Sequence, residues 1–260
     1  MGRPTGAAPL QVKYRAMTLG QNPNLPSTIS RCWKEGLTRS GFLATARSFA
    51  THIWEFLWES TPGQRRRRYG DAEYDWDYRV DTTSATVGWR ERLLGHFHSP
   101  YQPTEAALFR EMIASLEIDF QEFTFIDIGA GKGRTLLMAA DYPFRRILGI
   151  ELLPVLYRVS QKNLSSYKSD SQQCFAVEAV CGNAREFVFP AEPLVLYLFN
   201  PLPEAGMIDV MNNLVHSLSQ YPRVVYLLYR NPLFENILVR YPAFNKISGT
   251  PQYSIFRAFS

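Results

Sequence analysis

The sequence predicts an α/β fold in which a doubly wound, mostly parallel sheet is covered by helices. Residues 123–151 read as strand, glycine turn, helix and strand, which is one βαβ unit. Further short apolar runs follow, separated by segments with helical periodicity. The predicted strands are 123–128, 147–150, 175–180, 194–199, 224–229, 244–247 and 254–259. The predicted helices of this region are 105–116, 134–140, 155–165, 204–218 and 233–241.

The composition is that of an ordinary globular protein with room for a large core. The chain has 260 residues, of which 46% are hydrophobic and 20% are charged. It contains neither an apolar run of the ~18 residues that a membrane span needs nor the apolar core of a secretory signal. Cys32, Cys174 and Cys181 show no metal-binding or disulfide spacing. This fits a reducing compartment, so the sequence predicts a cytoplasmic protein without a membrane span.

The chain divides into an irregular segment (1–27), a helical cap with an acidic and aromatic loop (28–99) and the main domain (100–260). Pro and Gly in the first segment disfavour regular structure. Between Thr28 and Glu59, apolar residues recur at steps of three and four, which predicts one or two helices with a break near Gly41. Packing on the main domain accounts for these apolar residues better than a membrane surface does.

Charge is unevenly distributed along the chain. Residues 1–70 contain 11 Lys/Arg and 3 Asp/Glu, a net charge of +8, and the remainder is negative, at −4. The run Arg65–Arg68 suits nucleic acid or an acidic protein surface, although a solvated linker is the favoured interpretation. Residues 69–79 interleave acidic and aromatic side chains without a helix or strand period. This segment is either a lid for a cationic substrate or a loop pinned to the body by its aromatic residues.

The approach to the main domain contains a predicted short helix at 89–94 and two histidines, His96 and His98. Because no carboxylate or cysteine accompanies the histidines at ligand spacing, no metal site is predicted. Thr104 is expected to cap the helix at 105–116.

The glycine turn after the first strand has the composition of a nucleotide site. Glycines 129, 131 and 133 leave bare backbone where a ligand crosses the strand end, and the following helix directs unpaired N–H groups toward it. A phosphate loop requires Ser or Thr after Lys132, and a dinucleotide fingerprint requires glycine at Arg134, so neither motif fits. Asp127 repels a pyrophosphate but suits an amino group.

The remaining pattern, D-x-G-x-G-x-G from Asp127 followed by Glu151, resembles motif I of the class I S-adenosylmethionine (SAM) methyltransferases. The resemblance implies a Rossmann-like, seven-stranded sheet that ends in an antiparallel hairpin. It also implies that Glu151 binds the ribose hydroxyls. Residues 101–104 (YQPT) are similar to a loop of the seven-strand lysine methyltransferases that folds over the methionine end of the cofactor.

Two further segments carry the resemblance. Residues 181–187 are similar to the G-D-A-x-x-F segment that binds adenine, with Asn183 in place of the acid and its carbonyl still able to accept the adenine amine. Residues 200–203 (NPLP) resemble the N-P-P-Y signature of amine-methylating enzymes but lack its second proline and its aromatic residue. The missing aromatic residue argues against a flipped nucleobase as substrate. A strand-ending turn without a chemical role is the alternative.

The resemblance therefore implies a SAM-dependent methyltransferase, with S-adenosylhomocysteine (SAH) as product. The expected acceptor is an amine, such as a protein lysine, in preference to RNA bound through the basic N-terminal region. A third hypothesis is a protein that binds SAM without transferring the methyl group. The expected acceptor-side residues are Asn200, Pro201 and Tyr101. The expected cofactor-binding residues are Tyr101, Thr104, Asp127, Gly129, Ala130, Gly131, Gly133, Glu151, Leu152, Asn183, Ala184 and Asn200.

Overall fold

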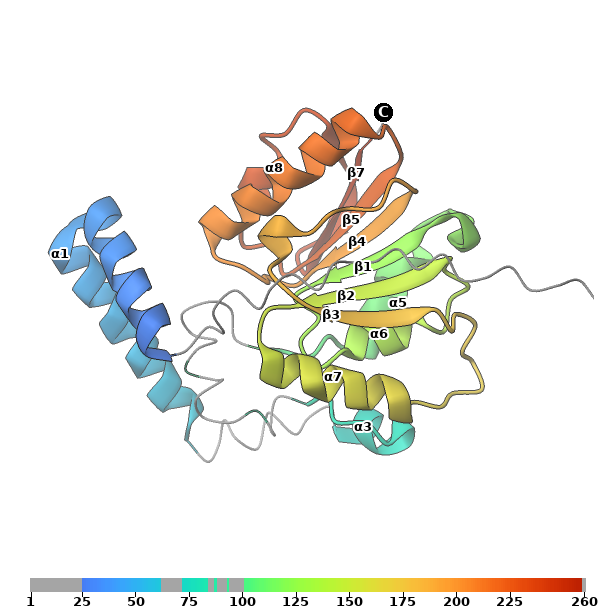
Figure 1. Cartoon of the computed structure of the whole chain (residues 1–260), viewed down its shortest axis with the longest axis horizontal. Helices are drawn as coiled ribbons and strands as arrows, with labels where there is room; N and C mark the ends of the chain where they lie inside the picture. Colours follow the sequence, from blue (N-terminus) through green and yellow to red (C-terminus); the bar gives the residue numbers. More distant parts are fainter. Residues whose placement is uncertain (1–24, 62–71, 84–86, 88–92, 94–100, 259–260) are drawn as a thin grey trace, which may run out of the picture.

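The computed structural model describes residues 25–61, 72–83, 87, 93 and 101–258, and in this part of the chain seven strands form one sheet (Figure 1). The strand order is β3-β2-β1-β4-β5-β7-β6, parallel except for β7, which is antiparallel to both neighbours. The predicted fold class is confirmed, including the C-terminal antiparallel hairpin. The strands are β1 (Thr124–Ile128), β2 (Arg146–Glu151), β3 (Val177–Cys181), β4 (Leu194–Leu198), β5 (Val225–Arg230), β6 (Phe244–Thr250) and β7 (Tyr253–Ala258).

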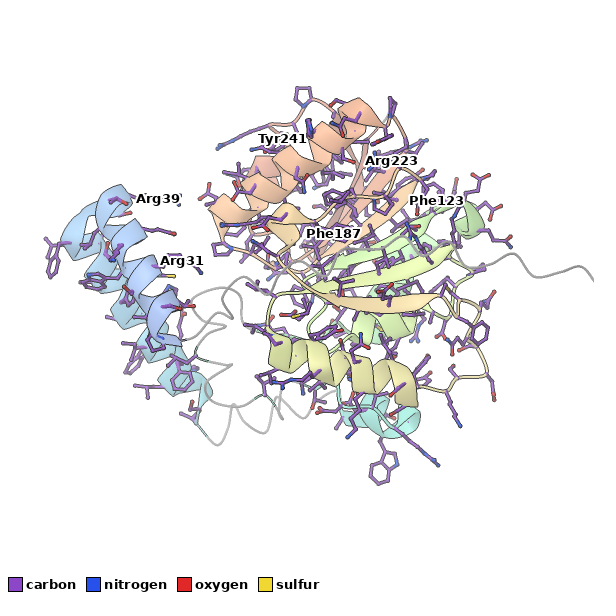
Figure 2. The ribbon with its side chains drawn as sticks, in the orientation of Figure 1. Arg31, Arg39, Phe123, Phe187, Arg223 and Tyr241 are labelled. Carbon is purple, nitrogen blue, oxygen red and sulfur yellow. The ribbon has the colours of Figure 1, made fainter. Side chains whose placement is uncertain are left out.

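Helices cover both faces of this sheet, which is why its central strands are largely apolar. Helices α5 (Ala106–Ala114), α6 (Arg134–Ala139) and α7 (Pro154–Ser166) pack on one face, against side chains such as Phe125. Helices α8 (Glu204–Gln220) and α9 (Glu235–Leu238) pack on the other, against Ile126. Phe187 lies between α8 and the sheet (Figure 2). Strands β1 and β4 are fully buried, as expected for parallel strands covered on both sides.

The register brings three loops together at the carboxyl edge of the sheet. Ile128, at the end of β1, pairs with Ile150 of β2 and with Leu198 of β4. The glycine turn at 129–133 is therefore flanked by the end of β2 and by the loop at 199–203. In an open α/β sheet this edge, where the strand order reverses, is the usual ligand site.

The N-terminal helices differ from the prediction in their packing. Helix α1 (Leu25–Glu59) is two helices joined at Gly41, whose φ of 76° confirms the predicted break. Trp33 packs edge-to-face on Phe49, with ring centroids 5.0 Å apart, and thus joins the two halves. However, Trp54 is 67% exposed, and Figure 1 shows α1 apart from the sheet. Among the described residues, the apolar side chains of α1 are therefore more exposed than expected, and a helical cap on the main domain stays a prediction.

A second correction concerns the acidic and aromatic segment, which contains helix α3 (Ala72–Tyr78) where a loop was predicted. Tyr74 and Tyr78 stand one helical turn apart with ring centroids at 4.7 Å, and Tyr78 packs on Tyr167 of the main domain at 5.4 Å. Acidic residues in the first turn suit the positive end of the helix. A helix of two turns is too short for its period to stand out in the sequence.

Two smaller differences concern the cap of α5 and the length of α9. Thr104 does not cap α5, because Glu105 occupies the cap position without a side-chain bond and the Thr104 hydroxyl pairs with Tyr197. Helix α9 spans four residues where nine were expected. The run Arg65–Arg68, both histidines and nearly all of the predicted helix at 89–94 lie outside the described residues. No helix in the described residues has both the length and the apolar character to cross a membrane.

Candidate functional site

The glycine turn uses each of its three glycines for a conformation that other residues rarely adopt. Gly129, Gly131 and Gly133 have φ values of 86°, 54° and 85°, all in the left-handed region. A Cβ atom at Gly129 would lie 2.6 Å from Cβ of Pro201. A Cβ atom at Gly131 would overlap the ring of Tyr101. The turn is therefore tightly enclosed by the loop after β4 and by Tyr101.

Glu151 binds this turn from the end of β2. Its Oε2 accepts a hydrogen bond from the Gly131 N–H at 2.8 Å, and its Oε1 accepts one from the Leu153 N–H at 2.7 Å. Burial raises the pKa of Glu151, and these backbone donors act against that rise. Each carboxylate oxygen retains further acceptor capacity, so the side chain can accept two hydroxyl groups of a ribose as well.

Asp127, near the end of β1, is the second buried acid of the site. Its carboxylate accepts a hydrogen bond from the Thr135 hydroxyl of α6. Burial raises the pKa of Asp127 to about 7, with the Thr135 bond opposing the rise and the charge of Glu151 adding to it. A cationic partner would lower the pKa of such a buried carboxyl group and so favour its ionised form.

The two acids open into one cleft at the carboxyl edge of the sheet. Its volume is about 930 Å³, counting the open space at its mouth, which suits a nucleoside-sized ligand. Most of the predicted residues line it: Tyr101, Thr104, Asp127, Gly129, Ala130, Gly131, Glu151, Leu152, Asn183, Ala184 and Pro201. Two of them, Gly133 and Asn200, do not. Gly133 instead forms the N-cap of α6.

The far end of the cleft is formed by Asn183 and Ala184, after β3. Asn183 Oδ1 accepts a hydrogen bond from the Arg185 N–H at 3.2 Å and caps a short 3₁₀ helix. Asn183 Nδ2 donates to Glu186 Oε1 at 3.2 Å. The amide donors thus have a partner, and the carbonyl oxygen keeps capacity for an adenine amine.

Asn200, expected on the acceptor side, turns toward β5. Its Oδ1 accepts a hydrogen bond from the Tyr229 hydroxyl at 2.9 Å, and its Nδ2 donates to the Asn231 carbonyl at 2.7 Å. The residue itself has a left-handed φ of 44°. A chemical role for the Asn200 side chain stays a prediction, whereas Pro201 does line the cleft.

Several residues of the site were not predicted from the sequence. Tyr197 lines the cleft and its hydroxyl lies 2.7 Å from that of Thr104. Tyr197 is the next-to-last residue of β4, so its position near the carboxyl end of the strand, where the site lies, is the signal that could have identified it. The sequence alone leaves two roles open for the basic residues of the turn, Lys132 and Arg134, which could neutralise a cofactor carboxylate or face solvent. They are 1% and 2% exposed, so they do not face solvent, and both bind residues 75–83.

Comparisons with known proteins add little beyond the fold. No protein-family model matches the chain, and no curated protein matches it. Among solved structures it is similar to an RNA methyltransferase from Salinibacter ruber in complex with S-adenosyl-L-homocysteine (19% identity, 60% of this chain and 92% of that one, TM-score 0.37). A predicted N6-adenine-specific DNA methylase from Listeria monocytogenes is also similar (13%, 60% and 51%, 0.46). So is a ribosomal protein L11 methylase from Lactobacillus delbrueckii subsp. bulgaricus (13%, 59% and 76%, 0.41). At these scores the similarities carry no argument about function, which has to come from the site.

Proposed function

We propose that this protein is a SAM-dependent methyltransferase. The observation that carries the proposal is the pair of buried acids, Asp127 and Glu151, on either side of a left-handed glycine turn in one open cleft. Glu151 suits the ribose hydroxyls, and Asp127 suits the cationic amino group of the methionine part. Asn183 and Ala184 suit the adenine. A dinucleotide or a triphosphate would place its phosphates near Asp127, whose charge disfavours both.

The chain's own contribution to the reaction is alignment and the exclusion of water. When bound, SAM supplies a methyl group already activated by a sulfonium, so the transfer requires neither a metal ion nor a covalent intermediate. Pro201 and Phe199, after β4, line the cleft beside the glycine turn and provide an apolar wall. Such a wall keeps water from competing with the acceptor.

An amine is the acceptor that we propose, with a protein lysine as the expected example. Tyr101 and Tyr197 line the cleft, but burial raises the pKa of each, and their hydroxyls already bond Thr82 and Thr104. Neither is therefore suited to take a proton from an oxygen or carbon acceptor. A protein lysine, with a usual pKa of about 10.4, has to lose a proton before it reacts. In its neutral form it attacks through its own lone pair and needs no further proton removed before the bond forms. The turn at 200–203 supports the same acceptor.

An RNA acceptor is the second candidate, and the charge distribution favours it. The net charge of +8 over residues 1–70 would attract a phosphate backbone. Transfer from labelled SAM into fractionated lysate tests the acceptor. Label in the protein fraction supports the amine proposal, and label in RNA supports the alternative. SAM binding without label in any fraction would indicate a protein that binds SAM but transfers nothing.

A further inference from the structure

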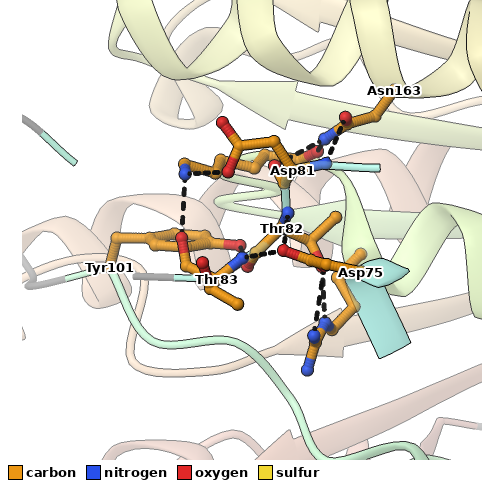
Figure 3. A network of polar contacts seen from close by, with 8 residues as sticks. Asp75, Asp81, Thr82, Thr83, Tyr101 and Asn163 are labelled. Carbon is orange, nitrogen blue, oxygen red and sulfur yellow. Dashed lines mark hydrogen bonds and ion pairs between the residues drawn. The ribbon is translucent and has the colours of Figure 1, made fainter. Parts of the chain in front are cut away.

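Residues 81–83 reach across to the glycine turn through Lys132. Asp81 Oδ1 and the Thr83 carbonyl each accept a hydrogen bond from Lys132 Nζ at 2.8 Å (Figure 3). The Lys132 side chain is 2% exposed, so its ammonium group is held away from bulk water by these partners. Burial lowers the pKa of Lys132, and the bond to Asp81 opposes that change.

The next residue of the same segment binds Arg134, which lines the cleft. Arg134 Nε donates to Thr82 Oγ1 at 2.7 Å, and Arg134 Nη2 lies 3.4 Å from Asp75 Oδ1. The guanidinium group also stands over the Tyr74 ring at 4.6 Å. Both basic residues that flank Gly133 are thus bound by the segment that contains α3.

Tyr101 provides a third connection. Its hydroxyl donates to the Thr82 carbonyl at 2.6 Å, and its ring fills the space beside Gly131. Asn163 of α7 completes the arrangement, because its Nδ2 donates to the carbonyls of Asp81 and Lys132 at 2.8 and 2.9 Å. Figure 3 shows Asp81, Thr82, Tyr101 and Asn163 in this network of polar contacts.

Helix α3 holds the segment in shape and is itself short and only partly buried. Asp75 Oδ2 accepts hydrogen bonds from the N–H groups of Thr82 and Thr83 at 2.7 and 2.8 Å. No residue of α3 is buried, and Trp76 is 86% exposed. A short element that contacts the core mainly through two partly buried tyrosines, Tyr74 and Tyr78, opens at low free-energy cost compared with the sheet. Its docking is therefore a separate step that a ligand can favour.

We propose that residues 72–83 are a positioning clamp that holds the glycine turn in its cofactor-binding conformation, so that cofactor binding and docking of the clamp favour each other. This inference rests on the proposed function. The turn contains three left-handed residues, and fixing it before binding lowers the entropic cost of binding. Coupling of this kind is reciprocal: whatever strengthens docking strengthens binding by the same factor. Because the clamp binds Lys132, Arg134 and Asn163, it belongs with the main domain and not with the N-terminal helices.

The first test uses the full chain and Asp81→Asn, with Asp77→Asn as the matched control. The Asp81 side chain is 45% exposed, so asparagine fits, but Lys132 loses its anionic partner. Asp77 is exposed on α3, within the same segment 72–83. We expect Asp81→Asn to weaken SAH binding in calorimetry about tenfold, within the usual range for coupled sites, and Asp77→Asn to leave it unchanged. A merely structural role would lower the melting temperature of Asp81→Asn and leave its SAH affinity intact, which would overturn the clamp.

The second test needs no variant. Chymotrypsin cleaves after aromatic residues, and cleavage after Trp76 or Tyr78 requires α3 to open. We expect saturating SAH to slow this cleavage in the wild-type chain several-fold. An unchanged rate overturns the clamp alone, because SAH binding itself is measured separately. A wild-type chain that does not bind SAH would overturn the proposed function, and the clamp with it.

Discussion

Replacement of Asp127 by asparagine should stabilise the ligand-free protein while weakening its binding of SAM. The residue is 3% exposed, and burial raises its pKa from 3.8 to about 7. The folded state therefore binds the proton about a thousand times more tightly than the unfolded state. At about 1.4 kcal/mol per factor of ten, ionised Asp127 costs the folded state about 4 kcal/mol at and above pH 7. Asparagine preserves an acceptor for the Thr135 hydroxyl but carries no charge.

The sign of the pH dependence follows from the direction of the change in pKa. A group whose pKa is raised in the folded state contributes stability that is complete below its unfolded pKa and is lost as pH rises through its folded pKa. For Asp127 this window runs from about pH 4 to pH 7. From pH 5 to pH 8 the wild type should lose about 3 kcal/mol relative to Asp127→Asn.

Urea unfolding of both proteins at pH 5, 6, 7 and 8, without ligand, measures this difference directly. Other titrating groups are present in both proteins, so the difference isolates residue 127. A difference that does not change with pH, or a wild type that is more stable than Asp127→Asn at pH 8, would refute the reasoning. In that case the buried carboxylate would have compensating partners, and it would have no need of a cationic ligand.

The other predictions concern the walls of the cleft. Gly131→Ala should lose SAH binding and about 1–3 kcal/mol of stability, because its Cβ overlaps the Tyr101 ring at a left-handed φ; calorimetry and urea unfolding measure the two effects. Tyr197→Phe should cost about 1–3 kcal/mol in urea unfolding, since the buried Thr104 hydroxyl loses its partner; a loss below 0.5 kcal/mol would contradict this. Asn200→Gly keeps the left-handed backbone and removes the side chain, so SAH affinity should stay normal while transfer from labelled SAM is lost; full transfer would exclude a chemical role for that side chain.

Much of the fold could be predicted because its signals are local. Strands β1, β2, β4 and β5 are short, largely apolar runs, and the turn after β1 needs glycine at three positions that adopt left-handed φ values. Local signals also identified residues of which most line the cleft, since parallel strands bring their carboxyl ends to one edge. Asp127 and Glu151 lie there because their strands pair in register.

The clamp could not be predicted because its partners are far apart in the sequence. Asp81 and Lys132 are separated by 51 residues, and Thr82 and Arg134 by 52. No period or motif marks such pairs, and in a single sequence a lysine in a glycine turn looks like a solvated or ligand-binding residue. The exposed faces of α1 were not predicted, because a helical repeat of apolar residues indicates a buried face but does not say what covers it.

Calorimetric titration of the wild-type protein with SAH most directly tests whether this cleft is a SAM site. Glu151→Gln and, as a matched control on the neighbouring strand, Glu178→Gln complete the measurement, since Glu178 is exposed on β3. We predict one SAH bound per chain, an affinity about tenfold weaker or worse for Glu151→Gln, and no change for Glu178→Gln. Absence of SAH binding to the wild type, or equal affinity in Glu151→Gln, would contradict the assignment of the cleft to SAM.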